Sequence, residues 1–252
     1  MAKGKRPIKR NPISHDTPEY HHFKALEKLD RASARILFDD HKIHLLIRER
    51  GGNIINSWEA NRGYRIYNRS FKAILGKSIV DALRVIPRKE GTPLTIIHDG
   101  IGEKARFSTE LKSKLNKLKI SSRIIGFSLE PSPEAKAKVG TVLWRLVEGP
   151  AEKHLPKKPV DAIISEFGSI DYAYPKVQKN HLLKLAYSLK KGGILMAGLG
   201  GGTIVDKRFM TGVVKAFQKR GFEARFGKPK LFSPLVNFSG TYPTFVLFVR
   251  RK

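Results

Sequence analysis

Short apolar runs alternate with amphipathic segments over residues 92–252. Seven runs have the length and β-branched content typical of strands: 94–98, 123–129, 142–147, 160–164, 194–197, 222–226 and 244–249. Between them, apolar residues recur at helical spacing, for example at Phe107, Leu111 and Leu115. This alternation predicts an α/β domain with a mostly parallel seven-stranded sheet and flanking helices.

Capping residues and glycines predict where several helices begin and end. Thr17, which is followed by proline, predicts the start of one helix. Ser70 predicts the cap of another, whose apolar stripe runs over residues 71–83. The pair Gly192-Gly193 stands where glycine commonly ends a helix, so we expect a helix to stop there before the strand at 194–197.

Basic residues exceed acidic ones along the whole chain. Lys and Arg number 49 against 22 Asp and Glu, which gives a net charge of +27. Residues 1–90 hold 20 basic and 10 acidic side chains, and residues 91–252 hold 29 and 12. A field of this sign attracts phosphate polymers, so nucleic acid is the predicted partner. A basic surface that serves only solubility is the alternative.

The pattern and composition divide the chain into three parts. We expect a flexible basic arm at 1–16, a small, mainly helical N-terminal module at 17–91 and the α/β domain at 92–252. No apolar run reaches the roughly 18 residues of a membrane span, and we expect a soluble, cytoplasmic protein without a membrane partner. The chain has no cysteine, and its histidines lack a recognisable ligand spacing, so no metal site is expected.

Two glycine-rich segments are candidates for a cofactor loop, because both follow an apolar strand. One is 94–105 (LTIIHDGIGEKA) and the other is 194–205 (ILMAGLGGGTIV). Only the first leaves enough chain for a nucleotide-binding sheet, since seven predicted strands begin at residue 94. We therefore expect the cofactor at the first loop and a turn or substrate-side role for the second.

The order of motifs after residue 94 resembles that of the class I S-adenosylmethionine (SAM)-dependent methyltransferases. The segment IIHDGIGEK matches the family's first strand and its Gly-x-Gly loop, and IIGFSLEPSPEA places an acid after the second strand. VEGPAEKHLP is similar to the third loop, and VDAIISEFGSIDY to the fourth strand. The resemblance implies a Rossmann-like fold, SAM as cofactor and methyl transfer as the reaction.

The resemblance also assigns roles to particular residues. Glu130 would bind the ribose, and Ala151 and Glu152 would border the adenine. Ser165 and Glu166 would face the reaction centre. The residues expected to bind the cofactor are His98, Asp99, Gly100, Gly102, Glu130, Ala151, Glu152 and Ser165. When the glycines are aligned, His98 stands where the family has its acid and Asp99 comes one place later. Either the site is shifted by one residue or the affinity for SAM is reduced.

A nicotinamide cofactor is the other interpretation of the first loop. Residues 100–105 satisfy G-x-G-x-x-A, but Glu130 follows Gly102 by 28 residues where about 20 is usual. The resemblance to methyltransferases accounts for more of the chain, so SAM is the expected cofactor.

Methyl transfer is an in-line displacement that demands alignment more than acid–base chemistry, so catalytic residues are difficult to identify from sequence. The candidates beside the fourth strand are Glu166, Asp171 and Tyr172. The basic charge favours an RNA methyltransferase acting on rRNA or tRNA, with structured RNA or a ribosomal particle as partner. A catalytically degenerate RNA- or ribosome-binding factor and a small-molecule or protein methyltransferase are the alternatives.

Overall fold

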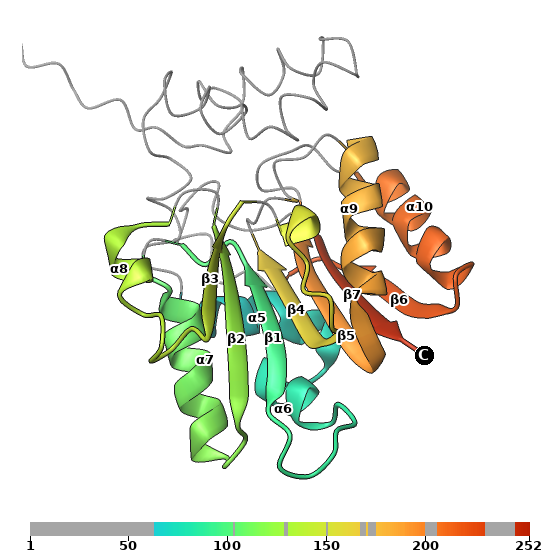
Figure 1. Ribbon diagram of the computed structural model, residues 1–252. Coiled ribbons are helices and arrows are strands. Elements are labelled where there is room, and N and C mark those ends of the chain that lie inside the picture. Colours follow the sequence, from blue (N-terminus) through green and yellow to red (C-terminus); the bar gives the residue numbers. More distant parts are fainter. Residues whose placement is uncertain are drawn as a thin grey trace, which may run out of the picture.

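The computed structural model describes residues 63–102, 104–128, 131–149, 151–166, 170, 175–199, 206–229 and 245–252, apart from the side chains of residues 152, 166 and 175–177 (Figure 1). The strands in this part are β1 (Leu94–Asp99), β2 (Ser122–Ser128), β3 (Arg145–Glu148), β4 (Val160–Glu166), β5 (Leu189–Leu199), β6 (Phe222–Gly227) and β7 (Phe245–Arg251). The helices are α5 (Tyr64–Leu75), α6 (Ile79–Arg84), α7 (Arg106–Lys117), α8 (Pro133–Lys136), the 3-10 helix η1 (Ala151–Lys153), α9 (Pro175–Tyr187) and α10 (Lys207–Gln218). The predicted helix start at Thr17 lies outside the described residues.

The strands form one sheet in the order β3-β2-β1-β4-β5-β7-β6. Strands β1 to β5 pair in parallel, and β7 enters antiparallel between β5 and β6. The predicted α/β class, with a Rossmann-like, mostly parallel sheet of seven strands, is confirmed. From β1 the chain first builds outward to β3 and then returns to add β4 on the other side. A topological switch point therefore lies between β1 and β4, where open α/β sheets bind their ligands.

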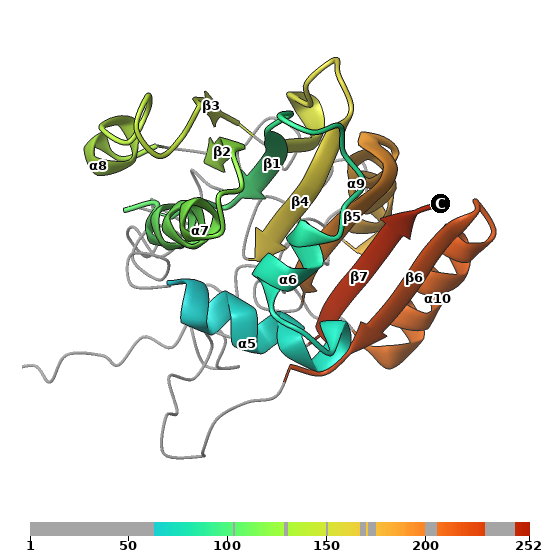
Figure 2. The same cartoon turned by 90° about the horizontal axis from the view of Figure 1, so that it is seen from below.

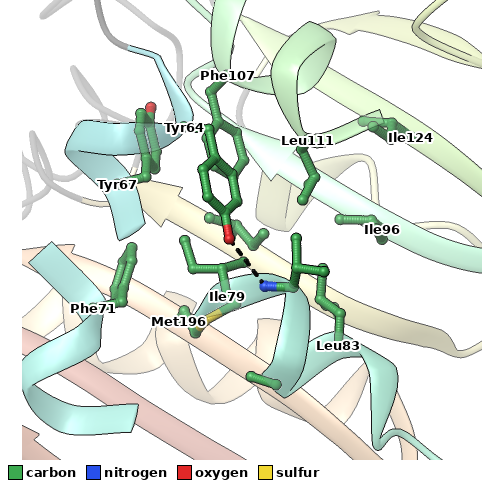
Figure 3. Packing of buried hydrophobic residues seen from close by; sticks show 14 of the residues in the cluster. Tyr64, Tyr67, Phe71, Ile79, Leu83, Ile96, Phe107, Leu111, Ile124 and Met196 are labelled. Carbon is green, nitrogen blue, oxygen red and sulfur yellow. Dashed lines mark hydrogen bonds between the residues drawn. The ribbon is translucent and has the colours of Figure 1, made fainter. Parts of the chain in front are cut away.

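Helices cover the sheet from both sides (Figure 2). Alternate strand residues point to opposite faces, so Ile96 belongs to the core under α5, α6 and α7, whereas Ile97 belongs to the core under α9 and α10. Figure 3 shows the first of these cores, where the rings of Tyr64 and Tyr67 of α5 stack on Phe107 of α7. The Tyr64 hydroxyl accepts a hydrogen bond from the backbone N–H of Val80 at 3.3 Å.

Hydrogen bonds join both ends of helix α5 to the sheet domain. At its start, the Glu110 carboxylate of α7 accepts a hydrogen bond from the backbone N–H of Tyr64 at 2.7 Å. Near its end, the Arg225 guanidinium of β6 donates to the carbonyl of Ile74 at 3.2 Å. Residues 64–84 thus share the core of the sheet. Residues 17–62 of the predicted 17–91 module lie outside the described residues, so the division into domains stays a prediction.

The predicted helix start at Ser70 is wrong. Helix α5 already begins at Tyr64, and Ser70 is a buried residue in its interior. The helix ends at Gly76, whose φ of +69° is favourable for glycine and whose N–H donates to the carbonyl of Lys72. Ser78 then caps α6 by accepting from the N–H of Asp81. The apolar stripe over 71–83 is continuous because both helices pack on the same face of the sheet.

Gly192-Gly193 does not end a helix, contrary to the prediction. Helix α9 ends at Tyr187, and both glycines lie inside β5. A Cβ at Gly193 would lie 2.9 Å from the carbonyl oxygen of Asp161 in β4, so the close approach of the neighbouring strand requires glycine there. The pairing register of β4 with β5 also shifts near this point, between Val160 and Ala162.

Candidate functional site

The carboxyl ends of β1 and β4 meet at the switch point and bring two predicted site residues together. Asp99 and Ser165 are register partners on these strands, and both are buried. The Ser165 hydroxyl donates a hydrogen bond of 2.8 Å to Oδ2 of Asp99. Because a buried carboxylate is costly without polar partners, this bond holds the Asp99 side chain against β4.

The loop after β1 folds back over β2. The backbone N–H groups of Gly100 and Ile101 both donate to the carbonyl of Phe127 at 3.1 Å. Gly100 and Gly102 have φ values of +82° and +67°, a conformation that side chains rarely adopt. Helix α7 begins four residues after Gly102, and the positive end of its dipole lies at the loop. The loop therefore lacks side chains at positions 100 and 102 and lies beside a helix terminus that favours an anionic group.

Sequence reasoning missed the residue that supports this loop from below. The side chain of Ile101 is buried against Gly126 of β2, where a Cβ would lie only 2.8 Å from Cγ2 of Ile101. Gly126 therefore leaves room for Ile101 and allows the loop to close over the sheet. An isolated glycine inside an apolar strand commonly marks such a close approach, and this was the signal available in the sequence.

The ends of β2 and β3 lie beside the same edge. The N–H of Gly149 donates to the carbonyl of Ser128 at 2.9 Å, and Ala151 is fully buried at the start of η1. Ala151 thus lies in the loop that the sequence assigned to the adenine. Glu152 belongs to η1 and Glu166 is the last residue of β4, but their side chains are not described. Glu130, Asp171 and Tyr172 lie outside the described residues.

His98 points to the opposite face of the sheet from Asp99, as strand alternation requires. Its ring packs between Tyr67 of α5 and Phe107 of α7, and Nδ1 lies 2.8 Å from the Ser108 hydroxyl. Nε2 lies 3.2 Å from the Tyr67 hydroxyl. Burial lowers the pKa of His98 from its usual 6.5 to about 3, so the ring is neutral at physiological pH. This placement favours a role in positioning the end of β1 over direct contact with a cofactor.

Metal and membrane features are absent from the part of the chain that the structure describes. No three His, Asp or Glu side chains there are grouped as metal ligands would be. No described helix has the length and apolar content needed to cross a bilayer.

No family model matches the chain, and no curated protein matches it. Among solved structures, the chain is similar to a 1,6-didemethyltoxoflavin-N1-methyltransferase from Burkholderia thailandensis with bound S-adenosylhomocysteine (TM-score 0.49, 13% identity, 100% of this chain and 94% of that chain). It is also similar to a chain in the Haloferax volcanii complex between the Trm112 methyltransferase activator and a candidate methyltransferase (0.47, 19%, 78% and 95%). A third is a SAM-bound amino pentose methyltransferase from Micromonospora echinaspora (0.47, 12%, 83% and 96%).

Proposed function

We propose that the chain binds SAM at the switch point between β1 and β4 and transfers its methyl group to RNA. The observation that carries the proposal is the buried Asp99–Ser165 hydrogen bond beside the Gly100–Gly102 loop. A carboxylate held there suits a cofactor that carries positive charge on its amino group and sulfonium. The adjacent helix terminus suits the carboxylate at the other end of the same amino-acid moiety.

The residues present fit such a cofactor. Gly100 and Gly102 have no side chain to block the approach of a ligand to the loop backbone. Glu130 remains the proposed ribose ligand, because a carboxylate can accept hydrogen bonds from two hydroxyls at once. Ala151 and Glu152 remain the proposed border of the adenine. The sequence left open whether the acid at the end of β1 is shifted, and we assign its role to Asp99.

We propose that the chain contributes to the reaction by aligning the nucleophile with the methyl group. SAM, when bound, supplies a methyl group on a sulfonium, which is a strong electrophile. The Ser165–Asp99 hydrogen bond holds the ends of β4 and β1 together, next to Glu166, the last residue of β4. Glu166, Asp171 and Tyr172 are the candidates for orienting the nucleophile or accepting its proton.

RNA is the proposed substrate because of the charge on the chain. The net charge of +27 is shared by both halves of the sequence and is not confined to the basic arm. Counterion release from a phosphate backbone would supply much of the affinity for such a surface. Structured RNA, as free rRNA or tRNA or within a ribosomal particle, is the partner that this charge suits.

The cofactor assignment is tested by calorimetric titration of the full chain with SAM. Gly102→Val should abolish binding, because a side chain at this position would block the approach of SAM to the loop backbone. Gly76→Val is the matched control, since Gly76 has a φ of +69° against +67° for Gly102 but lies at the end of α5. If Gly102→Val binds SAM with wild-type affinity, or if both variants lose SAM affinity equally, the placement of SAM at the Gly100–Gly102 loop is refuted.

The substrate assignment needs a separate experiment. Tritiated SAM should be incubated with the wild-type chain and, in parallel, with total RNA, with protein and with a metabolite extract. Label in RNA alone is the expected result. Label in protein or metabolites would replace RNA with another substrate class, and SAM binding without transfer to any of them would indicate a degenerate enzyme.

A further inference from the structure

The sheet lacks a described helix over part of its α9 side. Helix α9 packs on β5 and β7, and α10 packs on β6. Between β3 and β4, where a parallel crossover usually carries a helix, the described chain has only η1 followed by an irregular segment over 154–159. In Figures 1 and 2, no described helix lies over β2 and β3 on this side.

Basic side chains are exposed on this side of β2 and β3. Ile125, Phe127 and Val147 all belong to the core on the α9 side, so strand alternation directs Arg123 and Arg145 the same way. Both arginines are exposed. By the same alternation, the exposed Glu148 points to the opposite face and does not neutralise them.

Trp144 is exposed immediately before β3. Its exposed fraction is 54%, which is high for the largest apolar side chain. The Arg123 guanidinium lies 5.4 Å from the centre of the Trp144 ring, in a cation–π contact. The backbone N–H of Trp144 donates to the carbonyl of Ile124 at 2.8 Å, which fixes the base of the side chain against β2. An aromatic ring is thus presented to solvent next to a fixed positive charge.

The segment after η1 brings further cations to the same side. Leu155 packs against the core on the α9 side, so the segment passes over this face. Lys157 and Lys158 are exposed along it, and Lys153 is exposed at the end of η1. We call the following residues the β3 edge surface: Arg123, Trp144, Arg145, Lys153, Lys157 and Lys158.

We infer that the β3 edge surface binds a strand of the RNA substrate, with one base stacked on Trp144 and phosphates paired with the surrounding cations. This inference rests on the proposed function, because it takes RNA as the substrate. Stacking on an aromatic ring is tolerant of base identity, and a neighbouring arginine strengthens it. A protein interface would need a larger apolar centre than a single ring. Arg145 lies one short strand from the carboxyl edge, about 10 Å along β3, so a bound strand can continue toward Asp99.

The binding test uses the full chain and a fluorescein-labelled RNA hairpin with a single-stranded tail, followed by anisotropy. Trp144→Ala should weaken binding by about 5- to 150-fold, which corresponds to the loss of one base stack. Trp144→Phe should retain most of the affinity, because a smaller ring can still stack. Tyr187→Ala is the matched control, since Tyr187 is 51% exposed and packs near Phe222, away from the β3 edge surface.

The charge component is tested by the salt dependence of the same affinity. Arg123→Ala combined with Arg145→Ala should reduce the slope of log affinity against log salt by about 0.7–0.9 for each phosphate that is no longer neutralised. Lys215→Ala combined with Lys219→Ala removes the same charge from α10 and serves as the comparison. Equal salt slopes for the two double variants would indicate that positive charge anywhere on the chain contributes equally to RNA binding. That result would overturn the inference that RNA binds at the β3 edge surface.

A direct signal comes from tryptophan fluorescence. The chain has two tryptophans, so Trp58→Phe leaves Trp144 as the single reporter. RNA should quench its emission, and poly-glutamate should neither quench it nor compete with RNA. Unchanged affinity in Trp144→Ala, an absence of quenching, or equally tight poly-glutamate binding would each overturn the inference. If RNA binding depends on Trp144 but no label enters RNA, the proposed methyl transfer fails and the surface stands.

Discussion

The buried ring of His98 should make the protein sensitive to acid in a defined pH window. In the folded state, burial lowers the pKa of His98 from 6.5 to about 3. His98 therefore binds a proton near pH 6.5 in the unfolded chain, but only near pH 3 in the folded chain. Stability is complete above the higher pKa and falls as pH drops between the two values. Between pH 7.5 and pH 5 this one group should remove about 2 kcal/mol from the free energy of unfolding.

The assay is urea unfolding of the wild type and of His98→Gln at both pH values. A glutamine amide can still pair with the hydroxyls of Ser108 and Tyr67, but it does not titrate. Any constant cost of the substitution cancels, because the comparison is between the two pH values within each protein. The seven other histidines are common to both proteins. An equal loss of stability in both, or an NMR titration of His98 near pH 6.5, would refute the reasoning.

Three other perturbations test the loop, the ribose ligand and the charge. Gly126→Ala places a methyl group 2.8 Å from Cγ2 of Ile101 and should lower the free energy of unfolding by about 1–3 kcal/mol, measured by urea unfolding. This loss should be smaller when Ile101→Ala is present, and an unchanged loss would contradict the packing argument. Glu130→Ala should weaken SAM binding in calorimetry by about ten- to a hundredfold, and wild-type affinity would move the ribose ligand elsewhere. Deletion of residues 1–12 should reduce the salt slope of RNA binding only in part, because most of the excess charge lies beyond them; complete loss of the slope would confine RNA binding to the arm.

The mostly parallel sheet could be predicted from sequence because each strand is a short apolar run and amphipathic helical segments separate most of the runs. The residues at which helices begin and end were harder to predict from sequence. Ser70 has the chemistry of a helix cap, but the packing of Tyr64 and Tyr67 on Phe107 extends α5 past it toward the N-terminus. Gly192-Gly193 has the composition of a helix stop, yet the glycines serve the close approach of β4 to β5. In both places a contact distant in sequence overrides the local pattern.

The partners of site residues were harder to predict than the residues themselves. Asp99 and Ser165 could be picked out singly, but the bond between them depends on the pairing of β1 with β4. The partners of His98 come from α5 and α7, and α5 begins 34 residues before it. No sequence periodicity connects these positions.

The one-residue offset between His98 and Asp99 has a physical consequence that spacing alone does not reveal. Neighbouring residues on a strand face opposite sides, so moving the acid by one place moves its carboxylate through the sheet. At position 98 a side chain lies in a dry core against Tyr67 and Phe107, where a carboxylate would be buried among aromatic rings. At position 99 it meets the Ser165 hydroxyl on β4, at the switch point itself. A neutral histidine is compatible with the first environment and an aspartate with the second. The offset therefore keeps a carboxylate at the switch point, where we propose that SAM binds.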